Sequence, residues 1–336
     1  MTTFSIGDLA NTFQIRRQTA GLKAELTRLG SELTTGRKSD IGAALAGDFG
    51  PYAGIERSLR AVAAYTTANT EASGMLTAAQ LALENVQSMG HDLSPALLTA
   101  ASARDVTLIK TTAEDARQKF SGVVSSLNTS VADRTLFAGT ATDRPALASG
   151  EAMLAELALA VAGETTAAGI VTAVDSWFDD AGGGFETMGY LGASDDMGPL
   201  LIAEDETVAV DVRADNQVVR DTLKGYALAA LIAEGSLDGN LGEQADLISS
   251  AAGKMLASDG DLTNLRARIG AGEARVENAQ ARNAAEAAAY ELARTELIGA
   301  DPYQTATELE AVYSQIETLY TVTARIAGLN FTDYMR

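Results

Sequence analysis

The feature that most constrains this chain is an apolar stripe whose members are separated alternately by three and four residues. Near the C-terminus the stripe runs through Leu309, Val312, Ile316, Leu319, Thr323 and Ile326. This alternation is the heptad pattern of helices that pack side by side. The sequence therefore predicts a long terminal helix, and Tyr313 and Tyr320 flank its apolar stripe. The stripe and its flanks together are more than one partner helix can cover.

The same alternation occupies a longer stretch upstream, from Leu262 to Leu297, until "GADP" interrupts it at Gly299–Pro302. Proline lacks a backbone N–H donor and disfavours helix at the residue before it, which predicts a break between two helices. A helix of about 40 residues would be roughly 60 Å long. Helices of that length are uncommon in globular proteins.

The N-terminal third mirrors this arrangement. Leucines from Leu22 to Leu33 form a stripe that ends at "TTGRKSDIG", where Gly36 favours a turn. Further helices are expected over about 55–86 and 106–127, with a turn in "SMGHDLSP" before Pro95. Helices from opposite ends of the chain are therefore expected to pair antiparallel.

The middle of the chain, residues 139–214, has a different composition. It contains the glycine cluster "DDAGGGFETMG" and alternating apolar residues. Strands over Leu200–Ile202 and Val208–Val212, joined by a turn at Glu204–Glu206, would form a β-hairpin. A helical pattern returns over about 215–235.

These patterns predict a mainly α fold, in which both chain ends build a long antiparallel helical coiled-coil rod that carries a small inserted α+β domain. Three domains are expected: 1–42 with 300–336 as a terminal helical domain, 43–138 with 215–299 as the helical rod, and 139–214 as the outer inserted domain.

Composition excludes several classes of function. The chain has 45 Asp and Glu against 25 Lys and Arg, a formal charge of -20, so nucleic acid and anionic membranes are not expected partners. The absence of cysteine excludes disulfides, zinc–thiolate sites and thiol catalysis. The N-terminus lacks the pattern of a cleaved secretory signal, and no run of about 18 apolar residues occurs. We therefore expect no membrane insertion, and either a cytoplasmic location or export by another route.

The chain offers little that could carry chemistry. His91 is the single histidine, lies in the expected turn and has no companion ligands at helical spacing, so a turn or cap residue is the simpler interpretation. "LDGNLGE" from Leu237 and "SDGDLTN" from Ser258 place oxygens near glycines but lack the full calcium-loop pattern, so caps and turns are expected there. We predict no enzyme, with no catalytic, cofactor-binding or metal-binding residue and no cofactor.

Several segments resemble the flagellin family, over about residues 1–145 and 215–336. They are "LTRLGSELTTGRKSDIGAAL", "LNTSVADRTLFAGTATDRPAL", "LRARIGAGEARVENAQ" and the C-terminal "DPYQTATELEAVYSQIETLYTVTARIAGLNFTDYMR". The second is the most discriminating, because Leu-Phe-Ala-Gly-Thr followed by a later proline is similar to the hook–filament junction members of that family. At the glycine-arginine turn, Ile41 and Gly42 stand where the family usually has a second aspartate and a proline.

This resemblance implies a secreted structural protein of the bacterial flagellum, exported by the flagellar type III apparatus with an uncleaved N-terminal segment and placed at the hook–filament junction. The partners that it implies are copies of the chain in a ring, the hook-side junction protein (hook-associated protein 1), flagellin, and an export chaperone with the export apparatus. A filament flagellin is the nearest alternative, and a cytoplasmic coiled-coil scaffold is a more remote one.

The terminal helices would then form the assembly interface. We expect that interface to comprise Ile15, Leu22, Leu26, Leu29, Leu33, Leu309, Val312, Ile316, Leu319, Ile326, Leu329, Phe331 and Tyr334.

Overall fold

The computed structural model describes residues 6–328, and the side chains of residue 10 and residues 12–325. It divides into two compact units. The terminal unit consists of Met1–Ala63 with Ala285–Arg336, and the core unit is Ala64–Ala284. Two long helices, α3 (Gly50–Ala103) and α8 (Leu241–Ile298), run through both units. The described part of the chain is mainly helical with short strands, which confirms the expected fold class.

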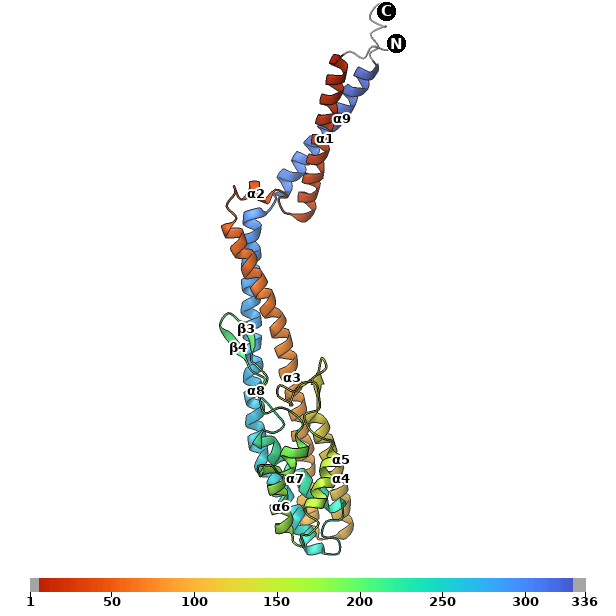
Figure 1. Ribbon diagram of the computed structural model, residues 1–336, viewed down its shortest axis with the longest axis vertical. Helices are drawn as coiled ribbons and strands as arrows, with labels where there is room; N and C mark the ends of the chain where they lie inside the picture. The colour runs from red at the N-terminus through yellow and green to blue at the C-terminus, as the bar shows by residue number, and fades with distance from the viewer. Residues whose placement is uncertain (1–5, 329–336) are drawn as a thin grey trace, which may run out of the picture. The chain divides into compact units, whose positions relative to one another are not determined.

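The terminal unit is built on two helices from opposite ends of the chain. Figure 1 shows α1 (Ile6–Thr35, red) beside α9 (Pro302–Gly328, dark blue). A four-residue helix, α2 (Ile41–Ala44), follows α1. No helix in the described range 6–328 is both long enough and apolar enough to cross a membrane.

The break between α8 and α9 is confirmed. The Asp301 side chain accepts hydrogen bonds from the backbone N–H groups of Tyr303 (2.8 Å) and Gln304 (3.0 Å). These are donors that have no partner inside a helix, so Asp301 serves as the N-cap. Pro302 follows at the first helical position, where its missing N–H costs nothing.

The core unit places shorter helices against α3 and α8. These are α4 (Val106–Leu127), α5 (Gly150–Ala160), α6 (Ala167–Asp179), the π-helical turn η1 (Phe185–Gly189) and α7 (Gln217–Ala233). Helix α7 confirms the helical pattern expected over 215–235, and it packs on α4, α5 and α6. Every side chain from Thr222 to Ile232 is buried, because α7 is covered on all sides.

Within the core unit, α3 and α8 run antiparallel. The side chain of Gln80 donates to the backbone carbonyl of Arg266 at 3.0 Å, and that of Gln87 donates to the carboxylate of Asp259 at 2.9 Å. The residue numbers of the partners on α8 fall as those on α3 rise, so the two helices are antiparallel. This is the expected pairing of the two halves of the chain.

The expected hairpin in the middle of the chain is present, but its second strand begins at Glu206, which was expected in the turn, and overlaps the predicted strand only at Val208. Strands β3 (Leu200–Ala203) and β4 (Glu206–Val208) pair antiparallel, with Leu200 opposite Val208 and Asp205 at φ 57° in the turn. Residues 209–212, expected to continue the second strand, follow β4 without a strand partner.

A second hairpin joins β1 (Ser130–Val131) and β2 (Arg134–Thr135). Its two turn residues, Ala132 (φ 49°) and Asp133 (φ 62°), both have positive φ. That is the backbone of a type I′ turn, whose twist matches that of the strands it connects.

The prediction of a turn before Pro95 is wrong, because α3 continues through that proline to Ala103. Leu93 and Leu97 on either side of Pro95 are fully buried, so packing holds the helix together where local preference would end it. The hydroxyl of Ser94 donates to the carbonyl of Gly90 at 2.9 Å. The chain turns instead at Arg104, and "SDGDLTN", expected as a cap or turn, lies inside α8.

The region expected as an inserted domain shares its core with the helices. Its aromatic residues Trp177, Phe178 and Phe185 belong to the same buried cluster as Phe120 on α4 and Tyr226 on α7. The Trp177 and Phe178 rings meet edge to face with centroids 4.8 Å apart. The three-part division of the chain stays a prediction, and the compact units of the structure are two.

Candidate assembly surface

The predicted interface residues that the structure describes lie mostly along the seam between α1 and α9. Leu29 is 1% exposed and Val312 is 7% exposed, whereas Leu33 is 40% exposed. The remaining described members are half-buried: Ile15, Leu22, Leu26, Leu309, Ile316 and Leu319. The side chain of Ile326 is outside the described residues, as are Leu329, Phe331 and Tyr334. The chain therefore brings the two predicted stripes together on each other.

Most of the large apolar side chains left exposed on these helices are aromatic, with Leu33 and Val322 as the aliphatic members. On α9, Tyr313 is 53% exposed and Tyr320 is 52% exposed. The two tyrosines are seven residues apart, which places them on one face of the helix. On α1, Phe13 is exposed as well. The sequence analysis places the two tyrosines beside the seam and does not include Phe13 among the interface residues. The seven-residue spacing of Tyr313 and Tyr320 is the sequence signal that indicates a second stripe.

A buried carboxylate fixes the end of α1. The side chain of Glu32 is 6% exposed and accepts a hydrogen bond from Arg28 at 2.7 Å. The same oxygen of Glu32 accepts from the backbone N–H of Ser39 at 2.9 Å. Hydrogen bonds to Glu25 and Glu32 raise the pKa of Arg28, so its charge is constant. Glu32 therefore ties the loop after α1 back onto the helix.

The loop itself pairs with the segment that joins α8 to α9. The N–H of Lys38 donates to the carbonyl of Ile298 at 2.8 Å, and the N–H of Ala300 donates to the carbonyl of Gly36 at 3.0 Å. Gly36 has φ 68°, a conformation that glycine adopts without strain. These bonds hold the start of α9 beside the end of α1, so that the two terminal helices can run back along each other.

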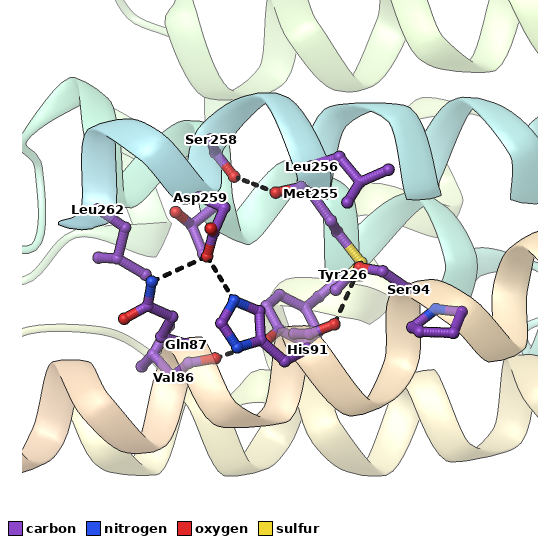
Figure 2. A pocket seen from close by; sticks show the side chains of 13 residues that line it. Val86, Gln87, His91, Ser94, Tyr226, Met255, Leu256, Ser258, Asp259 and Leu262 are labelled. Carbon is purple, nitrogen blue, oxygen red and sulfur yellow. Dashed lines mark hydrogen bonds and ion pairs between the residues drawn. The ribbon is translucent and has the colours of Figure 1, made fainter.

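His91 lies in a different part of the molecule, in the core unit. Figure 2 shows it beside a cavity of about 180 Å³ that is lined by α3, α7 and α8. Its Nε2 lies 2.8 Å from Oδ1 of Asp259. The expectation of a turn or cap residue is wrong, because His91 is inside α3 and contacts α8.

Tyr226 on α7 and Gly90 on α3 form part of the wall of the His91 cavity. The hydroxyl of Tyr226 donates to the backbone carbonyl of Val86 at 2.7 Å, and burial raises the pKa of that hydroxyl. A Cβ on Gly90 would meet this hydroxyl at 2.9 Å, so the glycine lets α7 approach α3. Within the described residues, no group of three or more His, Asp or Glu side chains could hold a metal ion.

Residues 244–335 match the family model described as the bacterial flagellin C-terminal helical region. The expected resemblance to the flagellin family is confirmed there. The flagellin-type region contains most of α8 and all of the described α9, and therefore both Tyr313 and Tyr320. No curated protein matches the chain.

Two solved structures of flagellar proteins are similar to this chain. FlgL of Bacillus cereus is 12% identical, with 70% of this chain and 96% of that chain covered and a TM-score of 0.51. A flagellar hook-associated protein from Vibrio parahaemolyticus is 15% identical, with 72% of this chain and 94% of that chain covered and a TM-score of 0.48. The likeness to FlgL shows a related fold.

Proposed function

We propose that this chain is a structural component of the bacterial flagellum that acts as an adaptor at the hook–filament junction, as hook-associated protein 3 does. The observation that carries the proposal is the exposed aromatic face on α9, inside the flagellin-type region. A single chain covers only one side of its terminal helices, so the other side is available to neighbouring subunits. The fold shared with FlgL supports the junction role.

Assembly would proceed by burial of that open face. Removing apolar surface from water stabilises association by about 25 cal/mol per Å². Part of this gain offsets the entropy lost when the terminal helices become fixed against neighbours. The proposed interface comprises Phe13, Tyr313 and Tyr320 together with the predicted residues that stay partly exposed, whereas Leu29 and Val312 are already buried where α1 packs on α9. The role requires no catalytic group or cofactor.

The proposed partners are copies of the chain arranged in a ring, the hook-side junction protein below and flagellin above. Before assembly the chain would be held by an export chaperone and secreted by the flagellar type III apparatus. Detection of the chain in sheared flagella tests this location, and its retention in the cytoplasm would favour the coiled-coil scaffold instead.

The assembly test uses the open face. We expect Tyr313→Asp/Tyr320→Asp to leave the unfolding free energy of the monomer nearly unchanged, because both side chains are half exposed already. The variant should fail to bind hook ends that carry the hook-side junction protein, and added flagellin should then form no filament in electron micrographs. Leu159→Asp is the matched control, because Leu159 on α5 is 71% exposed in the core unit. Normal junctions with the double variant would contradict the proposal.

A filament flagellin is the second candidate, because the matching family model is that of flagellin. A filament subunit repeats its contacts without closure, whereas an adaptor has unlike upper and lower faces and stops. We expect the purified chain to form no long filaments alone. Long filaments grown from this chain by itself would make flagellin the better assignment.

A further inference from the structure

We propose that a groove in the core unit binds an extended, acidic segment of a partner protein as an added β-strand. The groove has a volume of about 380 Å³ and lies between residues 207–212 and the α8 segment that contains Arg268 and Arg275. We call it the arginine groove. Figure 1 shows the β3–β4 hairpin beside α8.

One wall of the arginine groove has the features of an unpaired strand. Val208, Val210 and Val212 are buried, while the residues between them are exposed, which is the two-residue period of a strand. Strand β4 nevertheless ends at Val208. Within the described part of the chain, the backbone N–H and C=O groups of residues 209–212 make no hydrogen bond. An open strand edge of this kind is a template on which another chain can pair.

The other wall carries two arginines that form no ion pair within the described part of the chain. Arg268 and Arg275 are exposed, and neither forms an ion pair with another described residue. Arg282, one heptad further along α8, differs because it pairs with Glu206 at the hairpin. Asp211 is the one carboxylate that lines the groove, so two arginines face a single acid there. In a chain with a formal charge of -20, this is a local reversal of sign.

The two walls together select the chemistry of the occupant. Seven residues of helix place the backbones of Arg268 and Arg275 roughly 10 Å apart along α8. Alternate side chains of a strand point to the same side at intervals of about 7 Å, so glutamates on one face of an added strand can reach both arginines. Arginine binds carboxylate with paired, charge-assisted hydrogen bonds. The main chain of the same strand would satisfy the open edge at 209–212.

The test follows the backbone amides of the isotope-labelled full-length chain by NMR during titration with a short synthetic peptide in which Glu and Val alternate. We expect chemical-shift changes concentrated at residues 208–213. Arg268→Ala/Arg275→Ala should weaken the affinity by about tenfold, because two charge-assisted contacts are lost. Both side chains are exposed, so the variant should fold normally.

Two controls distinguish strand addition from non-specific electrostatic attraction between the acidic peptide and arginine side chains. The same peptide with N-methylated amides keeps its charge but cannot pair as a strand, and we expect it not to bind. Arg104→Ala/Arg144→Ala removes two exposed arginines outside the groove and should leave binding unchanged. The proposal is overturned by absence of shifts at residues 208–213, by equal binding of the N-methylated peptide, or by equal binding to the Arg268/Arg275 variant. The readout is made on the isolated chain and is independent of the junction role.

Discussion

The two units of this molecule contain the same kind of helix but bury very different amounts of apolar surface. In the core unit, α3 and α8 are packed with α4 and α7 around fully buried aromatic residues such as Phe120, Phe137 and Tyr226. In the terminal unit, the buried apolar residues among the described side chains are Leu29, Val62, Ile298 and Val312. A heptad pattern alone therefore says nothing about how completely a helix is covered.

This difference has a consequence for stability. Helices gain most of their stability from tertiary packing of an apolar face, and only weakly from intrinsic propensity. The core unit supplies that packing internally. The terminal unit supplies it on one side only, which is the condition expected of helices that are completed by neighbouring subunits.

The largest expected effect is in hydrogen exchange of the isolated chain. Local opening free energies range from near zero up to the full unfolding free energy, so the best-protected amides of the core unit should exceed those of α1 and α9 by about 5 kcal/mol. Exchange followed by mass spectrometry or NMR measures this difference. Equal protection in the two units would contradict the conclusion that the terminal unit is stabilised less than the core unit by packing within the chain.

The next largest effect is expected on the free energy of unfolding when a substitution creates a cavity in the core unit. Phe178→Ala removes a side chain that is 1% exposed and packs against Trp177 and Phe185. We expect a loss of about 3–5 kcal/mol in the free energy of unfolding, measured with denaturant. Leu159→Ala, at an exposed position, should change it by less than about 0.5 kcal/mol. A similar small value for Phe178→Ala would show that the α6 region packs loosely.

A smaller and local effect is expected at the end of α1. Glu32→Ala leaves the backbone N–H of Ser39 without its acceptor and removes one partner of Arg28. We expect a loss of about 1–3 kcal/mol in the protection of residues 36–40, with the core unit unaffected. Glu25→Ala is the matched control, because Glu25 also accepts hydrogen bonds from Arg28 but forms none with that loop among the described residues. Equal effects of the two changes would show that the loop does not depend on Glu32.

The smallest effect concerns an ion cluster in the core unit whose cation is buried, whereas Arg28, the cation of the Glu25–Arg28–Glu32 cluster in the terminal unit, is 35% exposed. The side chain of Lys224 is 3% exposed and lies 2.5 Å from Asp179 and 2.7 Å from Asp221. Asp175, which also pairs with Lys254, lies 3.9 Å from Lys224. Burial opposes ionisation of Asp179, but hydrogen bonds from Lys224 and Gln217 outweigh it and hold the pKa below the ordinary 3.8.

The sign of the pH dependence follows from that shift. A carboxylate whose pKa is lowered by folding contributes stability above its unfolded pKa and loses it as pH falls through the folded value. Burial also opposes the charge of Lys224, but its hydrogen bonds to Asp179 and Asp221 outweigh burial and raise its pKa above 10.5. The stability that Lys224 contributes is therefore lost only as pH rises through this raised pKa of the folded state. Lys224→Met should lower the unfolding free energy at neutral pH, with the difference from wild type shrinking below about pH 4. A difference that is constant from pH 7 to acid would show that packing, and not charge, is lost.

The sequence by itself determined the long helices, their break at Pro302 and the hairpin after Leu200. These features depend on neighbours in the chain: a heptad repeats locally, proline lacks a donor wherever it stands, and a turn needs only its own few residues. The resemblance of the C-terminal helices to flagellin could likewise be read from their residues. The candidate seam was predicted for the same reason, because each stripe is visible along one helix.

Only the tertiary structure decided the rest. Pro95 has the local preference of a helix end, yet the buried Leu93 and Leu97 keep α3 continuous, because packing against other helices outweighs one lost hydrogen bond. Pairing of α1 with α9 covers Leu29 and Val312 and leaves Tyr313 and Tyr320 open, a choice between two apolar stripes that depends on the partner helix. The arginine groove joins residues more than fifty positions apart. No local pattern could show that β4 stops at Val208 beside two arginines that have no ion-pair partner among the described residues.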